Sequence, residues 1–179
     1  MSYKDIQVIK SKMFEEVIVI KPDISTDLRG NIYTTYNEEF YKEILPQGLH
    51  FMHDKFATSK HNVLRGLHGD SKTWKLVSCV WGELYEVVVD MRPESITYKK
   101  WEAFTLKAED YSQVLIPPGF VNGYYVVSSH AVFHYKLAYS GDYIDANEQI
   151  TVLWNDPSLS IDWQCKNPIL QARDLMEPK

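Results

Sequence analysis

The stretch KLVSCVWGELYEVVVD, residues 75–90, decides the fold class. Two apolar, β-branched runs, Lys75–Val80 and Leu84–Asp90, flank the tripeptide Trp81-Gly82-Glu83. Such residues favour extended backbone, and glycine supplies the positive φ that a tight turn needs. We therefore predict two strands joined by a hairpin turn.

Similar strand patterns recur along the chain at intervals of roughly 8–12 residues. They predict further strands at Val17–Ile20, Asn31–Tyr36, Val63–Leu67, Trp101–Leu106, Ser112–Ile116, Gly123–Val127 and Ala131–Ala138. Helix patterns are scarce: Asn37–Leu45 predicts about two turns with Asn37 as N-cap, and Ala108–Tyr111 predicts one turn. Together these patterns predict an all-β sandwich or barrel, in one domain spanning residues 1–179.

The composition is that of an ordinary soluble globular protein, with 45% apolar and 24% charged residues. It excludes disordered, collagen-like and coiled-coil chains. The net charge is −5 and the basic residues are scattered, so we expect no nucleic-acid partner.

The N-terminal segment lacks the apolar core of a signal peptide, and Val17–Ile20 is too short an apolar run to span a bilayer. Cys79 and Cys165 have no partners at metal or CxxC spacing, so we expect neither a disulfide framework nor a metal-bound cysteine. These features predict a cytoplasmic protein without a membrane partner.

Period-two alternation places polar groups on otherwise apolar strand faces. Tyr135 shares a face with Phe133 and Leu137, and Lys75 shares one with Val77 and Cys79. Buried polar groups need partners, so both residues lie either in a satisfied network or in a pocket.

The six histidines suggest a test for a metal site. A metal-binding cupin presents His-x-His, but in VLRGLHGD, residues 63–70, His68 is followed by glycine and aspartate. We therefore expect no metal, and Arg65 and His68 remain candidates for binding and proton transfer.

Six blocks occur in a fixed order: DLRGNIYTTYN, VLRGLH, GELYEVVVDMR, LIPPGFVNGYYV, HYKLAY and LWNDPSLSIDW. Over about residues 14–175, this pattern resembles the nucleotide-sugar 3,5-epimerases of the dTDP-4-dehydrorhamnose 3,5-epimerase family. The resemblance implies a cupin-type jelly roll that needs no metal or organic cofactor. It also implies a homodimer in which N-terminal strands are exchanged.

The resemblance assigns roles to individual residues. It implies His68 as the general base, Asp174 as the carboxylate behind it, Tyr135 as the general acid on the opposite face, and Lys75 as the cation near the C4 oxygen. Arg65 and Arg29 match arginines around the diphosphate, with Arg29 reaching in from the other subunit. Without the resemblance, ordinary structural roles are the more frequent ones for such residues: a core tyrosine, a lysine at a strand end, an arginine in a turn and a solvated aspartate near the C-terminus.

The departures from the family concern the substrate. Asn122 replaces a histidine of the family's PPGFAHGF block, Thr34 replaces a glutamate, and His53 replaces a glutamine at positions that recognise the base. Tyr139 and Tyr143 are candidates for stacking on a base or a sugar. The pattern resembles GDP-4-keto-heptose epimerases of capsule biosynthesis, so a GDP-linked heptose is the expected substrate.

We therefore predict an epimerase that inverts C3, C5 or both in a nucleotide-linked 4-keto-6-deoxy sugar through an enolate. One alternative is a C3 epimerase or a 3,4-ketoisomerase on the same scaffold. Another is a non-catalytic cupin that binds nucleotide sugars, which the joint presence of an acid and a base disfavours.

Overall fold

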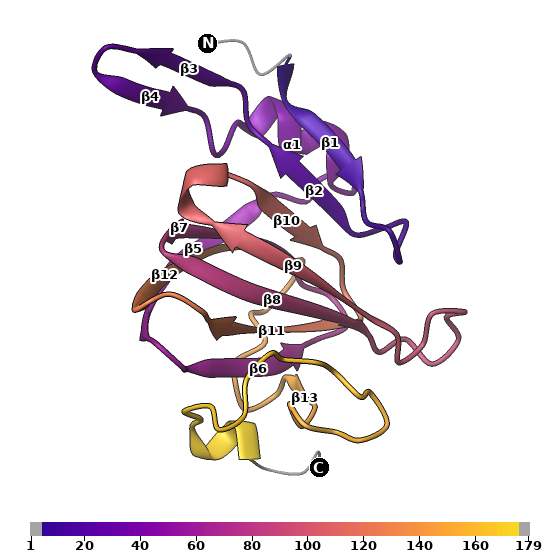
Figure 1. The fold of residues 1–179 in the computed structure, drawn as a ribbon. Coiled ribbons are helices and arrows are strands. Elements are labelled where there is room, and N and C mark those ends of the chain that lie inside the picture. The colour runs from indigo at the N-terminus through magenta and orange to yellow at the C-terminus, as the bar shows by residue number, and fades with distance from the viewer. Residues whose placement is uncertain (1–4, 176–179) are drawn as a thin grey trace.

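The computed structural model describes residues 5–175 and shows two antiparallel sheets packed face to face (Figure 1). The first sheet has the order β1-β2-β10-β7-β12-β5. Its strands are β1 (Gln7–Lys10), β2 (Ile18–Lys21), β10 (Gln113–Ile116), β7 (Trp74–Trp81), β12 (His130–Ala138) and β5 (Phe51–Lys60). The second sheet has the order β13-β6-β11-β8-β9. Its strands are β13 (Ile150–Thr151), β6 (Leu64–Gly69), β11 (Phe120–Val126), β8 (Glu83–Asp90) and β9 (Trp101–Lys107). The predicted jelly-roll class is confirmed.

The hairpin predicted around residue 82 is wrong in its pairing. Both strands exist, but β7 pairs with β10 and β12, whereas β8 pairs with β11 and β9 in the other sheet. The turn carries the chain from one sheet to the other. Gly82 has φ +78°, and a Cβ there would lie 2.3 Å from the His130 carbonyl oxygen, so the crossing requires glycine.

The remaining predicted strands are present, and β4 (Gly30–Tyr33) ends before the predicted limit at Tyr36. Sequence patterns missed β1, β3 (Ile24–Asp27), β5 and β13. The helix is confirmed as α1 (Glu38–Ile44), whose N-cap Asn37 accepts a hydrogen bond from the Phe40 amide at 3.0 Å. The predicted single turn is confirmed as η2 (Ala108–Asp110).

The main core lies between the two sheets because alternate residues of each strand point inward. Val77 of β7 and Phe133 of β12 meet Leu84 and Val88 of β8 there, and Cys79 is buried among them. A second cluster, which includes Val87 and Val89, lies on the other face of β8 and packs against Trp163 of the C-terminal segment. The C-terminal segment is therefore anchored to the second sheet.

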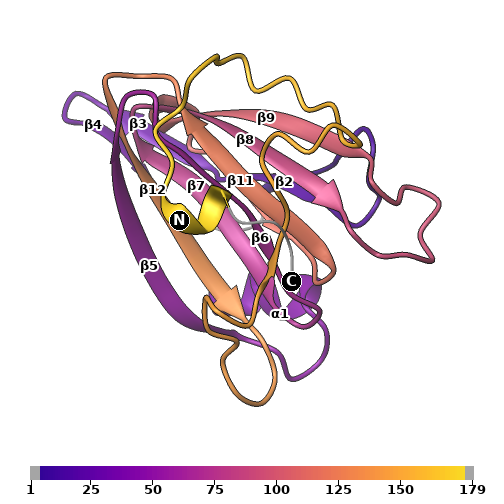
Figure 2. The same ribbon diagram turned by 90° about the horizontal axis from the view of Figure 1, so that it is seen from below.

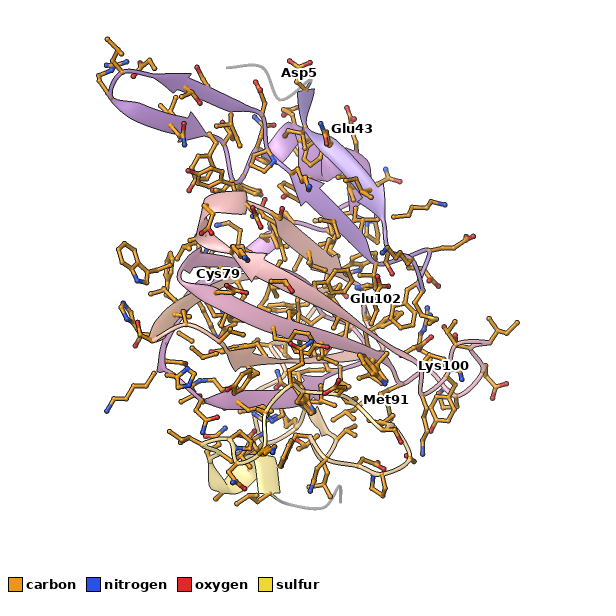
Figure 3. All side chains as sticks on the ribbon, viewed as in Figure 1. Asp5, Glu43, Cys79, Met91, Lys100 and Glu102 are labelled. Atoms are coloured by element: carbon orange, nitrogen blue, oxygen red, sulfur yellow. The ribbon has the colours of Figure 1, made fainter. Side chains whose placement is uncertain are left out.

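The N-terminal elements lie at one end of the sandwich. β3 and β4 form a separate hairpin that projects away from the two sheets, and α1 lies beside β1 and β2 (Figure 1). Glu102 of β9 accepts a hydrogen bond from the Met13 amide at 2.9 Å and ties the segment after β1 to the second sheet (Figure 3). No helix within residues 5–175 is long and apolar enough to cross a membrane. Both cysteines are free thiols.

Candidate active site

A cavity of about 250 Å³ opens between the two sheets. Its walls come from β5, β7 and β12 on one side and from β6 and β11 on the other, with the C-terminal segment along its edge. The polar residues that line it are Arg65, His68, Lys75, Asn122, Tyr124, Tyr135, Tyr143, Gln149, Gln171 and Arg173. Six of the residues predicted from the sequence, Tyr143 among them, therefore line one cavity.

His68 of β6 lies in this cavity with a buried carboxylate behind it. The C-terminal segment, yellow in Figure 2, returns to β6, where η3 (Ala172–Leu175) places Asp174 Oδ1 3.1 Å from His68 Nε2. Asp174 is 0% exposed and also accepts a hydrogen bond from the Gln171 amide at 3.3 Å. Burial lowers the pKa of His68 below its ordinary value of 6.5, while Asp174 opposes that shift. His68 is therefore a neutral base at pH 7, with the carboxyl group of Asp174 3.1 Å behind it.

Lys75 of β7 crosses the sandwich toward β6 and β11. Its Nζ donates to the His68 carbonyl oxygen and to Asn122 Oδ1, both at 2.7 Å. Asn122 Nδ2 in turn donates to Glu86 Oε1 at 2.7 Å. Burial lowers the pKa of Lys75 to about 8, although Asp70 and Glu86 raise it. A cation, an amide and a carboxyl group thus form one buried chain.

Tyr135 enters the same cavity from the other sheet. It lies on β12, where the predicted alternation places it beside Phe133, with ring centroids 5.4 Å apart. His68 and Tyr135 therefore approach the cavity from opposite sheets. Arg65 of β6 also lines the cavity, and its Nε donates to Ser59 Oγ at 3.1 Å.

Aromatic residues gather at one side of the cavity around His53 of β5. The His53 ring lies 4.7 Å from the Tyr143 ring and 5.7 Å from the Tyr139 ring, centroid to centroid. Lys55 Nζ donates to the Tyr143 hydroxyl at 3.0 Å. The three predicted stacking and base-recognition residues of this region thus form one cluster, and Tyr143 connects it to the cavity.

Arg29 and Thr34 do not line the cavity of their own chain. Arg29 lies at the turn of the β3–β4 hairpin, where its side chain is 90% exposed and pairs with Asp27. Thr34 directly follows β4. The two predicted contacts from this hairpin are therefore not formed within one chain.

Sequence analysis missed Glu86, Gln149, Gln171 and Arg173. Glu86 had a signal, because it interrupts the apolar inward row formed by Leu84 and Val88 of β8. Arg173 Nη2 donates to Gln149 Oε1 at 3.1 Å at the edge of the cavity, and its proximity to Asp174 in the sequence was the only hint.

This set of side chains is suited to moving protons. It combines a base with its carboxylate, a phenol on the facing wall, and the cations Lys75, Arg65 and Arg173. Within residues 5–175, no group of three or more histidine, cysteine, aspartate or glutamate side chains is arranged to hold a metal ion.

Comparisons with known proteins agree on one family. The family model described as dTDP-4-dehydrorhamnose 3,5-epimerase matches residues 11–179. The Salmonella typhimurium dTDP-4-dehydrorhamnose 3,5-epimerase is 36% identical over 167 residues, which cover 91% of this chain and 90% of the relative. The Streptomyces niveus dTDP-4-dehydrorhamnose 3-epimerase is 32% identical over 166 residues, 89% of this chain and 77% of the relative.

A solved structure shares the fold across nearly the whole chain. It is the Legionella pneumophila dTDP-6-deoxy-D-glucose-3,5-epimerase in complex with dTDP-4-keto-L-rhamnose. The TM-score is 0.86 and the identity is 35%, with 95% of this chain and 90% of that chain covered. These names indicate dTDP-linked sugars and give no support to the expected GDP-linked heptose.

Proposed function

Because the chain belongs to the dTDP-4-dehydrorhamnose 3,5-epimerase family, and is thus an isomerase, we propose that it inverts C3 and C5 of a nucleotide-linked 4-keto-6-deoxy sugar. The observation that carries this proposal is the placement of His68 and Tyr135 on opposite sheets of one cavity, with Asp174 3.1 Å behind the histidine. Such an arrangement provides a base on one face of a bound sugar ring and an acid on the other.

The substrate's own C4 ketone makes the chemistry possible. It acidifies the hydrogens at C3 and C5, since the electron pair left by a departing proton spreads onto the C4 oxygen as an enolate. His68 removes the proton, and Tyr135 returns one to the opposite face of the same carbon. Asp174 stabilises the imidazolium that forms. Each positioned acid or base typically contributes about 10²–10⁴-fold to the rate.

Lys75 is placed to stabilise the enolate. Two of its N–H groups are used by the His68 carbonyl oxygen and Asn122, which leaves the third for the sugar's C4 oxygen. Loss of a donor to a developing oxyanion typically costs about 3–4 kcal/mol in the barrier. Arg65 and Arg173 add positive charge for the diphosphate.

The names of the relatives favour dTDP as the nucleotide. A GDP-linked heptose is the second candidate. It is favoured by the cluster of His53, Tyr139 and Tyr143. At the position of His53, family members that bind dTDP carry a glutamine. Thr34 in place of the family's glutamate points the same way. Turnover of the two nucleotide sugars compared in parallel distinguishes the candidates.

The proposal includes a homodimer in which the β3–β4 hairpin of each chain completes the site of the other. Arg29 supports this, because it is 90% exposed on a hairpin that projects from the body (Figure 1). Apolar side chains on the outer face of the first sheet, such as Phe56 at 64% exposure, offer a surface for the second copy. Co-expression of Arg29→Ala and His68→Asn chains should restore about a quarter of wild-type activity, since half of the dimers are hybrids with one intact site. If the two inactive variants restore nothing together, the hairpin does not serve the partner.

The decisive experiment is mass spectrometry after incubation in D₂O with dTDP-linked and GDP-linked 4-keto-6-deoxy sugars. Two deuterons in the product support inversion at C3 and C5. A single deuteron favours the C3 epimerase or ketoisomerase alternative, and the S. niveus 3-epimerase is a relative of that kind. The His68→Asn variant should bind nucleotide but incorporate no deuterium. If the wild-type protein incorporates none from a broad panel of such sugars, the nucleotide-sugar-binding alternative holds instead.

A further inference from the structure

We infer that Glu86 is a positioning residue that acts as a neutral carboxylic acid and, through Asn122, holds Lys75 as a cation without a counter-ion beside the reacting sugar. This inference rests on the proposed function, since it assigns a role within the same site. Glu86 does not touch the substrate, and it acts only through the amide between it and the lysine.

The geometry at Glu86 is that of a buried group with too few partners for an anion. Glu86 is 0% exposed, and its Oε1 accepts one hydrogen bond, from Asn122 Nδ2 at 2.7 Å. Its Oε2 is buried and has no hydrogen-bond partner within residues 5–175. An ionised carboxylate in this position would leave one oxygen uncompensated, and such burial is strongly unfavourable. A carboxylic acid fits the same place with less loss of solvation.

The contacts of Lys75 complete the argument. Both hydrogen-bond acceptors at its Nζ are neutral, the His68 carbonyl oxygen and Asn122 Oδ1. No carboxylate of the described residues forms an ion pair with it within 4.0 Å. The Asn122 amide is fixed with its oxygen toward Lys75 because its nitrogen is held by Glu86. The positive charge of the Lys75 ammonium group is therefore not neutralised by these contacts.

The surrounding charges agree with this protonation state. Burial raises the pKa of Glu86 to about 8, against the opposing effects of Asn122 and Lys75. Lys75 also faces Asp70, which raises its pKa, and Arg173, which lowers it together with burial. At pH 7 the chain is mainly a protonated lysine and a neutral acid. As the pH rises above neutral, the acid ionises, and the ammonium group then has a negative neighbour that raises its pKa and offsets its charge.

A neutral Glu86 has a catalytic consequence. A carboxylate one amide away would attract the ammonium charge and weaken its pull on an enolate oxygen. A neutral acid keeps the orientation of Asn122 but leaves the charge free for the transition state. Glutamine can reproduce this role, because its amide oxygen accepts the same hydrogen bond from Asn122 Nδ2, whereas alanine cannot.

The test compares Glu86→Gln and Glu86→Ala with a matched control, Glu83→Gln, whose side chain on the same strand pairs with Lys107. We expect Glu86→Gln to keep kcat at pH 7 within about threefold of wild type and to alter the alkaline limb of the pH profile. Glu86→Ala should lose about tenfold to a hundredfold in kcat, with KM little changed, because Lys75 is no longer oriented. If the glutamine variant loses as much kcat as the alanine variant, the inference is overturned.

A second measurement needs neither a variant's activity nor a substrate. In wild-type protein with carbon-13 at glutamate side-chain carboxyls, one resonance should remain that of a protonated acid at pH 7 and disappear in Glu86→Gln. If the resonance that disappears in Glu86→Gln is instead that of an ionised carboxylate at pH 7, the inference is overturned. Failure of the proposed function would instead appear as missing deuterium incorporation by wild-type protein, so the two failures are distinguishable.

Discussion

Replacing Asp174 by asparagine tests whether a buried carboxylate supports His68 as a base. Asp174 Oδ1 lies 3.1 Å from His68 Nε2, and the residue is 0% exposed. When His68 takes a proton from the sugar, the new positive charge faces this carboxylate. Asparagine keeps the size of the side chain and removes its charge, so the variant isolates the electrostatic contribution.

The geometry sets the size of the expected effect. At 3.1 Å and an effective dielectric constant of about 20, two unit charges attract by about 5 kcal/mol. That energy corresponds to an upper limit of about 10⁴-fold in rate. The proton is only partly transferred in the transition state, and burial of the carboxylate offsets part of the gain. We therefore expect kcat to fall by about 10²- to 10⁴-fold, with KM changed by less than about threefold.

The assay is deuterium incorporation followed by mass spectrometry over a range of pH, with Asp110→Asn, on the exposed turn η2, as the control. His68 must be unprotonated to act, so activity falls as the pH drops through its lowered pKa. Since Asp174 raises that pKa, the acid limb of the variant should move to lower pH. A kcat within about threefold of wild type, together with an unmoved acid limb, would refute the reasoning.

Three other perturbations have defined outcomes. Gly69→Ala would place a Cβ 2.1 Å from the Phe120 carbonyl oxygen, so urea titration should show a loss of about 2–4 kcal/mol in unfolding free energy, and unchanged stability would contradict the packing. Tyr135→Phe should return sugar that has exchanged deuterium but kept its configuration, which NMR detects; normal inversion would remove Tyr135 from the mechanism. Although burial acts the other way, hydrogen bonds from Arg92 hold the pKa of Asp90 below 3.8, so this carboxylate stabilises the fold above about pH 4 and less as the pH falls. Asp90→Asn should thus unfold more easily at pH 7 but lose less stability on acidification. If the unfolding free energies of variant and wild type fall in parallel as the pH is lowered, Asp90 does not have this role.

The strands with apolar inward rows were predictable from the sequence, and β5 shows why others were not. The inward row of β5 contains His53, Lys55, Ala57 and Ser59, which face or flank the cavity, so the expected alternation is absent. Phe56 and Met52 are exposed on the outer row. The strand β5 was therefore missed in the sequence, because its inward side chains line or flank the cavity and do not form an apolar row in the core.

The pairing of strands was less predictable than their positions. The local sequence pattern predicts that residues 74–81 and 83–90 are extended. It does not distinguish a hairpin from a crossing between sheets, because both connections can use the same glycine at the turn. The difference lies in contacts with strands far along the chain, β10, β12 and β11. A local sequence window contains no information about such partners.

The candidate site was partly predictable through its family blocks. His68, Asn122 and Tyr135 lie in such blocks and meet in one cavity, which Lys75 also lines from the strand that follows the first of these blocks. Glu86 lies in a block too, but its role depends on Asn122, which the register of β8 with β11 brings near. Arg29 lies on a hairpin that does not reach its own cavity, so its role depends on a second chain.

The proposed base and the proposed acid stand on different sheets, which makes the thickness of the sandwich a determinant of reaction rate. The spacing between the layers is set by core side chains such as Val77, Leu84 and Val88. A substitution there that leaves the melting temperature unchanged can still alter the gap that a sugar ring must fill. Laboratory evolution toward sugars of different size should therefore select changes in the hydrophobic interior as well as at the cavity mouth.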